Sequence, residues 1–169
     1  GRLAKLVLIL GAITISIPIA LMLLVMWDMG FLTPHPSDEA LVDALRSQRQ
    51  EFDQLLEMAR EDSTMKVVHL RYRRPEVAIT EARWNEYRQL LEHLETDADI
   101  RRLETGEVLF TMSTKGLAIG GSMKGLAYCP TPPALVFNSL DRTPAGLPPN
   151  QEGYRHIEGN WYVYFRFDP

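Results

Sequence analysis

Cysteine is almost absent from this chain of 169 residues, which contains only Cys129. A single cysteine excludes an internal disulfide, so the fold must be held together by packing. The four histidines lack the H-x-x-x-H spacing of a metal site, and no C-x-x-C pair occurs. We therefore expect no metal ion and no other cofactor.

Motifs for nucleotide binding are missing as well. The glycine-rich segment 116–125 has two glycines at the spacing of a phosphate-binding loop, but Ser122 occupies the position at which such a loop requires lysine. The segment also lacks the strand-to-helix context of a dinucleotide site. A hairpin between two strands, in which the glycines permit a tight turn, is the simpler interpretation.

No catalytic unit is evident from residue spacing. Ser122 and Lys124 form an S-x-K pair, whereas a serine–lysine nucleophile requires S-x-x-K on one face of a helix. His69 and His156 fall in predicted strands and could meet across a sheet, although a structural role is the commoner one for such histidines. The sequence therefore predicts a protein that is not an enzyme.

No lysine or arginine occurs between Lys5 and Arg46, so the charged residues are distributed unevenly along the chain. All 22 acidic residues follow Trp27, whereas only 16 of the 18 basic residues do (18 less Arg2 and Lys5), so the part after Trp27 has a net charge near −6. Such a charge argues against nucleic-acid binding and against a polybasic lipid-binding surface. Sequons of the N-x-S/T type are also absent, which fits a bacterial envelope better than a eukaryotic lumen.

The longest feature that is present is a run of 22 residues without a charge, Leu6–Trp27. As a helix that rises about 1.5 Å per residue, this run crosses the roughly 30 Å hydrocarbon core of a bilayer. Arg2 and Lys5 precede it and acidic residues follow it, which keeps the N-terminus in the cytoplasm. A cleaved signal peptide is the competing interpretation, but its apolar part is usually about 7–15 residues long.

These observations predict a single-pass protein of the bacterial inner membrane. The residues beyond the span are enough for one hydrophobic core and too few for two. The predicted parts are a cytoplasmic tail (1–5), an uncleaved signal-anchor that forms a transmembrane helix (6–27), a tether (28–37) and a periplasmic domain (38–169).

The domain is expected to begin with a helix over residues 38–62, for which Ser37 can serve as N-cap. An apolar stripe recurs along this helix at helical spacing. We expect the stripe to pack on the domain's own sheet, and a homo-oligomer is the alternative. Its main members are Leu41, Leu45, Phe52 and Leu55.

A strand is expected over residues 65–73, and a second helix after the N-cap Thr80. The rest of the chain consists of short β-prone runs separated by glycine and proline. Strands are expected over 107–114 and 134–140, and a terminal hairpin around the turn 158–160. This order predicts an α+β domain in which two helices pack on a mostly antiparallel sheet.

Two groups of residues are candidates for binding a partner. Arg71 and Arg73 would share one face of the strand 65–73, as a positive strip that docks acidic groups or, more plainly, as a solvated strand face. Tyr162 and Tyr164 alternate with apolar residues of the last strand, and tyrosine is frequent in binding hot spots, although this face could equally be a half-exposed sheet face under a helix.

The leading hypothesis is a membrane-anchored periplasmic module that binds another protein. In one version it is an immunity protein that neutralises a toxin acting on the envelope, and in a second it is a scaffold subunit of an envelope assembly. A small periplasmic hydrolase or glycan-binding domain is the alternative from a different functional class.

Overall fold

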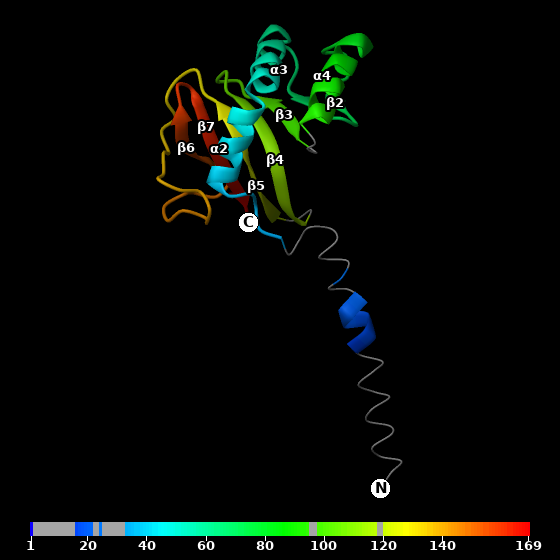
Figure 1. The fold of residues 1–169 in the computed structure, drawn as a ribbon, viewed down its shortest axis with the longest axis vertical. Helices are drawn as coiled ribbons and strands as arrows, with labels where there is room; N and C mark the ends of the chain where they lie inside the picture. Colours follow the sequence, from blue (N-terminus) through cyan, green and yellow to red (C-terminus); the bar gives the residue numbers. More distant parts are fainter. Residues whose placement is uncertain (2–15, 22–23, 25–32, 95–97, 118–119) are drawn as a thin grey trace. The chain divides into compact units, whose positions relative to one another are not determined.

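The computed structural model (Figure 1) divides the chain into two compact units, residues 1–34 and residues 35–169. Residues 16–21 are helical, and the described residues include no helix that is both long enough and apolar enough to cross a bilayer. Most of the predicted tail and of the predicted span 6–27 lies outside the described residues. The structure describes residues 1, 16–21, 24, 33–94, 98–117 and 120–169.

Three helices and seven strands make up the described part of the second unit, in the order of an α+β domain (Figure 1). In chain order they are α2 (Asp38–Ser47), α3 (Arg49–Glu61), β1 (Val67–Val68), β2 (Arg73–Arg74), α4 (Glu81–His93), β3 (Asp99–Arg102), β4 (Val108–Leu117), β5 (Gly120–Tyr128), β6 (Glu152–Glu158) and β7 (Trp161–Asp168).

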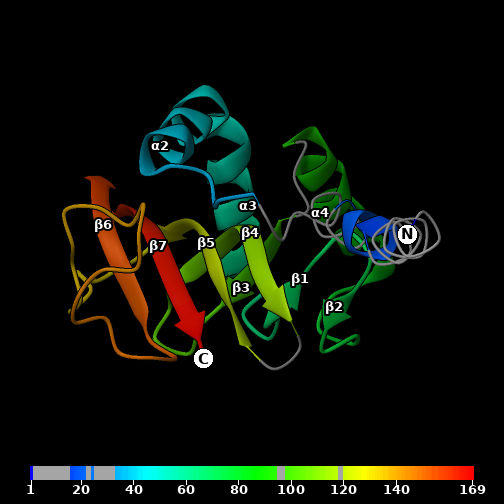
Figure 2. The ribbon, with the colours of Figure 1, turned by 90° about the horizontal axis from the view of Figure 1, so that it is seen from below.

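All these strands belong to one sheet, in the order β2-β1-β3-β4-β5-β7-β6, and every pair of neighbours is antiparallel. Helices α2 and α3 lie over one face of the sheet, as Figure 2 shows. Apolar residues of α4 belong to the same core as those of α2 and α3. The predicted α+β class and the antiparallel sheet are therefore confirmed.

The apolar stripe of the first two helices fills the core between helices and sheet. Leu45, Phe52 and Leu55 are fully buried there, and Leu41 is 2 % exposed. The ring of Phe52 packs edge-on against Trp161, with 6.2 Å between the ring centres. Because the domain's own core uses these four side chains, they are not available for the contact between two copies that the stripe also suggested.

The predicted helix over residues 38–62 is two helices in the structure. Gln48, with φ −119° and ψ 32°, leaves the helical conformation and separates α2 from α3. Its backbone NH still donates to Ala44 O at 3.0 Å, so the chain turns without losing this hydrogen bond. Glutamine is a good helix former, so the residue type gives no sign of the break.

The predicted strand over residues 65–73 is instead a hairpin. Only Val67–Val68 form β1, and the chain then turns back into β2. The turn is closed by a 2.8 Å hydrogen bond from His69 N to Tyr72 O. The turn escaped prediction because residues 69–72 contain no glycine, proline, asparagine or aspartate, the types that usually mark one.

Two further differences concern strands. The segment 134–140, expected to be a strand, forms only a single parallel bridge, between Val136 and Tyr154 of β6. Strand β3 was not expected, because three of its four residues are charged. The two predicted glycine-containing hairpins are confirmed, since β4 pairs with β5, and β6 pairs with β7 around Gly159, whose φ is +52°.

Candidate functional site

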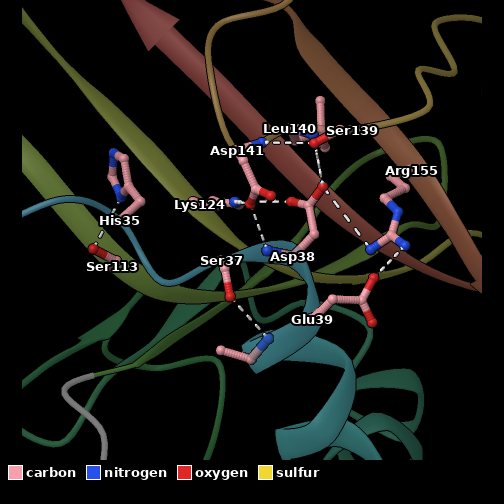
Figure 3. Close-up of polar contacts among 11 residues, drawn as sticks. His35, Ser37, Asp38, Glu39, Ser113, Lys124, Ser139, Leu140, Asp141 and Arg155 are labelled. Atoms are coloured by element: carbon pink, nitrogen blue, oxygen red, sulfur yellow. Dashed lines mark hydrogen bonds and ion pairs between the residues drawn. The ribbon is translucent and has the colours of Figure 1, made fainter.

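A dense group of polar contacts surrounds the N-terminus of α2 (Figure 3). Ser37 caps the helix, as predicted, by accepting a hydrogen bond from Ala40 N at 3.2 Å. Asp38 is 2 % exposed, and its Oδ2 accepts hydrogen bonds from Leu140 N at 2.7 Å and from the Ser139 hydroxyl at 3.0 Å. The loop before β6 is thereby tied to the first turn of the helix.

Lys124 of β5 is buried beneath this turn (Figure 3). Its Nζ lies 2.8 Å from Asp38 Oδ1 and 3.1 Å from Asp141 Oδ1. A hydrogen bond from the backbone NH of Asp38, and then the ammonium of Lys124, lower the pKa of Asp141. Arg155 adds a second cation, 3.9 Å from Asp38 and 2.6 Å from Glu39. These opposite charges compensate one another, which makes their burial tolerable. Because they come from α2 and from strands β5 and β6, the network also holds α2 against the sheet.

His35 lies beside this network, shortly before α2. Its Nδ1 is 2.9 Å from Ser113 Oγ and its Nε2 is 2.8 Å from Ser122 Oγ, so β4 and β5 contribute one hydroxyl each. Burial, and then the positive charges of Lys115 and Lys124, lower the pKa of His35 to about 4. The imidazole is therefore neutral near pH 7, and it donates to one serine while accepting from the other.

A serine hydroxyl in contact with an imidazole is also the arrangement of a nucleophile and its general base. In such sites the other ring nitrogen is usually oriented by a carboxylate, whereas here it meets Ser113. A base whose pKa is near 4 removes a proton poorly at neutral pH. The geometry fits a structural tie between His35 and the two strands better than a catalytic pair.

The sequence placed His35 in the tether and gave it no partner. The contact joins residues that are 78 and 87 positions apart, so no local spacing reveals it. The same holds for the pair of Lys124 with Asp38. His69 and His156 do not meet across the sheet. His69 lies in the turn of the β1–β2 hairpin, where its Nδ1 accepts from Arg71 N. His156 lies in β6, as predicted, opposite Tyr162 of β7, and its Nε2 lies 3.0 Å from Gly159 O.

A cleft of about 490 Å³ lies between α3 and the turn of the β6–β7 hairpin. Two arginines lie over aromatic rings in it, Arg49 at 5.5 Å from the ring centre of Trp161 and Arg60 at 5.1 Å from that of Tyr128. The hydroxyl of Tyr128 accepts a hydrogen bond from Asn160 Nδ2 at 3.1 Å. Three acidic residues also line the cleft, namely Asp53, Glu57 and Glu158.

Tyr162 and Tyr164 share a face of β7, as predicted, but they are 6 % and 1 % exposed and cannot form a binding surface. They lie on the sheet face opposite the helices, in a second, smaller apolar cluster. The hydroxyl of Tyr164 donates to Thr111 Oγ1 at 2.7 Å, across Gly125 of the strand between them. The alternation of the strand was predictable, whereas the burial of its second face was not.

Arg71 and Arg73 do not lie on one continuous strand. Arg71 is exposed in the turn of the β1–β2 hairpin, and Arg73 belongs to β2. Arg73 pairs with Glu81 at 3.0 Å and lies 4.6 Å from the ring centre of Trp84, so it holds α4 against the hairpin. Of the two arginines, Arg71 has the exposure that contact with a partner requires.

Among the described residues, no group of three or more histidine, cysteine, aspartate or glutamate side chains could hold a metal ion. Cys129 is buried, and this burial raises the pKa of its thiol to about 12. No protein-family model matches the chain, and no curated protein or solved structure is detectably similar to it. The arrangement of its own side chains is therefore the basis for a functional inference.

Proposed function

We propose that this chain is a binding protein of the bacterial envelope, held in the inner membrane by residues 6–27, with its domain in the periplasm. The domain binds another protein. In the version that we favour, this partner is a toxin that acts on the envelope, and the chain is an immunity protein that masks it. A scaffold subunit of an envelope assembly is the second version of the same proposal.

The cleft beside α3 is the observation that carries this proposal. Tyrosine and arginine are among the residue types most enriched at hot spots of protein interfaces, and both line this cleft, whereas Trp161, which also lines it, is only 2 % exposed. Arg60 is already stacked on Tyr128, so it loses little conformational freedom when a partner binds. The net charge near −6 after the predicted span favours a partner with a basic surface.

The N-terminal segment supports attachment to a membrane. Exposed apolar surface costs about 25 cal/mol per Å² in water, whereas lipid accommodates it. The charges that flank the segment favour a cytoplasmic N-terminus. In the part of this segment that the structure describes, four large apolar side chains are 53–67 % exposed. These are Ile17, Ile19, Leu21 and Leu24.

Topology is the first part of the test. A phosphatase that is active only in the periplasm, fused after Pro169, should be active in cells. Activity of a cytoplasm-only reporter at the same position would overturn the orientation, because the C-terminal domain would then lie on the other side of the membrane.

Partner binding is the second part. The partner is captured on the detergent-solubilised chain, and its affinity is measured for Arg60→Ala, Tyr128→Ala and Arg142→Ala. Arg142 is an exposed arginine outside the cleft and serves as the matched control. We expect a loss of at least about tenfold for the two cleft variants and of about twofold or less for the control. Equal affinities would exclude the cleft as the binding site.

A growth assay separates the two versions. If the captured partner is a toxin, its production in the periplasm should stop the growth of cells that lack this chain, and co-production of the chain should restore growth. A partner that leaves growth unchanged and co-purifies with further envelope proteins would favour the scaffold version.

A hydrolase is the second candidate function, and one observation favours it, the 2.8 Å contact between Ser122 and His35. The low pKa of His35 and the serine on its other nitrogen count against this function. Loss of activity on removal of the Ser122 hydroxyl alone is the measurement that would favour it.

A further inference from the structure

A second hollow, of about 390 Å³, opens between the β1–β2 hairpin, β3 and the middle of β4. Ile100 belongs to the helix-side core, so its neighbours Asp99 and Arg101 project from the opposite face of the sheet, where they line this hollow. The register of β4 with β5 shifts between Thr111 and Ser113, which also line it. Such bulges often re-aim side chains beside binding sites.

Asp99 and Arg101 form a charged pair in the wall of the hollow. Nε and Nη2 of Arg101 each lie 3.1 Å from Oδ2 of Asp99. Oδ1 of Asp99 has no hydrogen-bond partner among the described residues, although the side chain is only 9 % exposed. A buried carboxylate oxygen without a donor is unfavourable, so it provides a place for an N–H or O–H group of a ligand, directly or through one water.

Flat aromatic rings form another wall of the same hollow. The rings of His69 and Tyr72 are stacked, with 4.8 Å between their centres and 17° between their planes. The guanidinium of Arg74 lies 5.5 Å from the ring centre of Tyr72 and braces the stack. Thr114, which is exposed, adds a hydroxyl group to the lining, whereas the Thr111 hydroxyl already accepts from Tyr164. Flat rings beside a few convergent polar groups are typical of a small-molecule site.

We propose that this hollow binds one sugar residue that carries an acetamido group, of the kind found in N-acetylglucosamine. The acetamido N–H donates to Asp99, and its carbonyl oxygen accepts from Nη1 of Arg101, which the contacts with Asp99 leave unused. The C–H groups of the sugar pack on the aromatic wall, and one of its hydroxyls bonds to Thr114. A peptide amide could form the same hydrogen bonds with Asp99 and Arg101, but it has no sugar hydroxyl to bond to Thr114.

This inference does not depend on the proposed protein partner, because the hollow and the cleft beside α3 share no residue. The test is a titration of the full chain in detergent micelles with N-acetylglucosamine, followed by the amide signals of the backbone in NMR spectra. Saturable shifts are expected around the charged pair and the bulge of β4, in residues 99–101 and 111–114. Glucose, which lacks the acetamido group, should bind at least about tenfold more weakly.

Variants decide whether the predicted groups bind the sugar. Asp99→Asn and Tyr72→Ala should each weaken binding at least about tenfold, whereas Asp168→Asn, a carboxylate that also pairs with an arginine but lies at the end of β7, should leave it unchanged. Because the Tyr72 residue is 41 % exposed, its variant keeps the test valid if the Asp99 variant fails to fold. Equal binding of glucose, tighter binding of N-acetylglycine amide, unchanged affinity of both variants, or an absence of saturable shifts would each overturn the proposal.

Discussion

The ammonium of Lys124 lies 2.8 Å from a carboxylate oxygen of Asp38, and the two side chains are 1 % and 2 % exposed. This pair joins the middle of β5 to the first turn of α2. Two charges so deeply buried are tolerated only because each compensates the other and because Asp141 and Arg155 complete the network. This ion pair therefore helps to fix the position of the first helix on the sheet, together with the apolar residues of the helix.

Removal of the cation tests this role. We expect Lys124→Met to lower the free energy of unfolding by about 3–5 kcal/mol, because Asp38 is left buried without its partner. The double variant with Asp38→Asn should recover part of the loss. Urea unfolding followed by circular dichroism measures both. Asp53→Asn is the control, since its pair with Arg49 is 50 % and 40 % exposed and contributes about 1 kcal/mol or less. Equal losses for Lys124→Met and this control would contradict the role of the ion pair.

Gly125 is expected to tolerate no side chain. A Cβ at this position would lie 2.0 Å from Phe110 O and 2.8 Å from Met112 N, both of them backbone atoms that cannot easily move. Gly125→Ala should therefore cost more than about 3 kcal/mol or prevent folding. At Gly159, where φ is +52° and a Cβ would meet nothing within 4 Å, Gly159→Ala should cost only about 1–2 kcal/mol. Similar thermal unfolding of the two variants would refute this contrast.

Stability should fall on mild acidification because of His35. Its pKa is lowered from 6.5 to about 4 in the folded chain, so between these values the unfolded chain binds a proton that the folded chain does not. The contribution of His35 is then fully present above pH 6.5 and is lost as the pH falls towards 4. The slope is at most about 1.4 kcal/mol per pH unit, reduced because the ring is only partly buried. In His35→Gln this part of the pH dependence should disappear, and an identical pH profile for both proteins would exclude the effect.

The hydroxyl of Ser122 and the imidazole of His156 should not be essential for the biological activity. We expect Ser122→Ala and His156→Ala to retain protection in the growth assay within a few fold of the unchanged chain. His156 is exposed and lies 3.0 Å from the Gly159 carbonyl of its own hairpin turn. A loss of at least about a hundredfold with the fold intact, near 2.7 kcal/mol of transition-state stabilisation, would instead require an enzyme.

Arg71 offers a test of the positive strip. If it meets a carboxylate of the partner, Arg71→Glu should weaken binding more than Arg71→Ala, because it adds repulsion to the loss of attraction. The double variants that also change Arg73 should in addition lower stability, since Arg73 holds Trp84 and Glu81. A contact at the rim of an interface slows association and depends on salt. Equal affinity of the unchanged chain and both Arg71 variants, at low and at high salt, would rule out the strip.

Local signals in the sequence were sufficient for much of the fold. Ser37 and Thr80 cap their helices through the expected side-chain hydrogen bonds, and Gly159 marks the turn of the last hairpin. These features depend on residues within a few positions of one another. The break at Gln48 was missed because helix propensity does not report where the chain must turn to keep its apolar residues in the core.

The polar groups of the sites depend on contacts between distant segments, and spacing does not reveal these. From the sequence alone, Lys124 resembles an ordinary exposed lysine next to glycines. Its ion pair with Asp38 forms only when the folded chain places α2 against β5. Tyr164 was a candidate for partner binding because strand alternation gives two faces without stating which of them is covered, and the structure buries it. Arg71 and Arg73 do not share one strand for a related reason, since a continuous strand was expected where the chain turns at residues 69–72.

The segment 134–137, which runs beside β6, protects one edge of the sheet. Phe137 N donates to Tyr154 O at 2.7 Å, and Tyr154 N donates to Leu135 O at 2.8 Å, so part of the outer backbone of β6 is already paired. At the opposite edge, β2 is only two residues long. A domain confined to a membrane surface, as proposed, collides with its neighbours often, and open strand edges would invite intermolecular β-pairing. The loop therefore leaves fewer backbone groups of β6 open to pairing with another molecule.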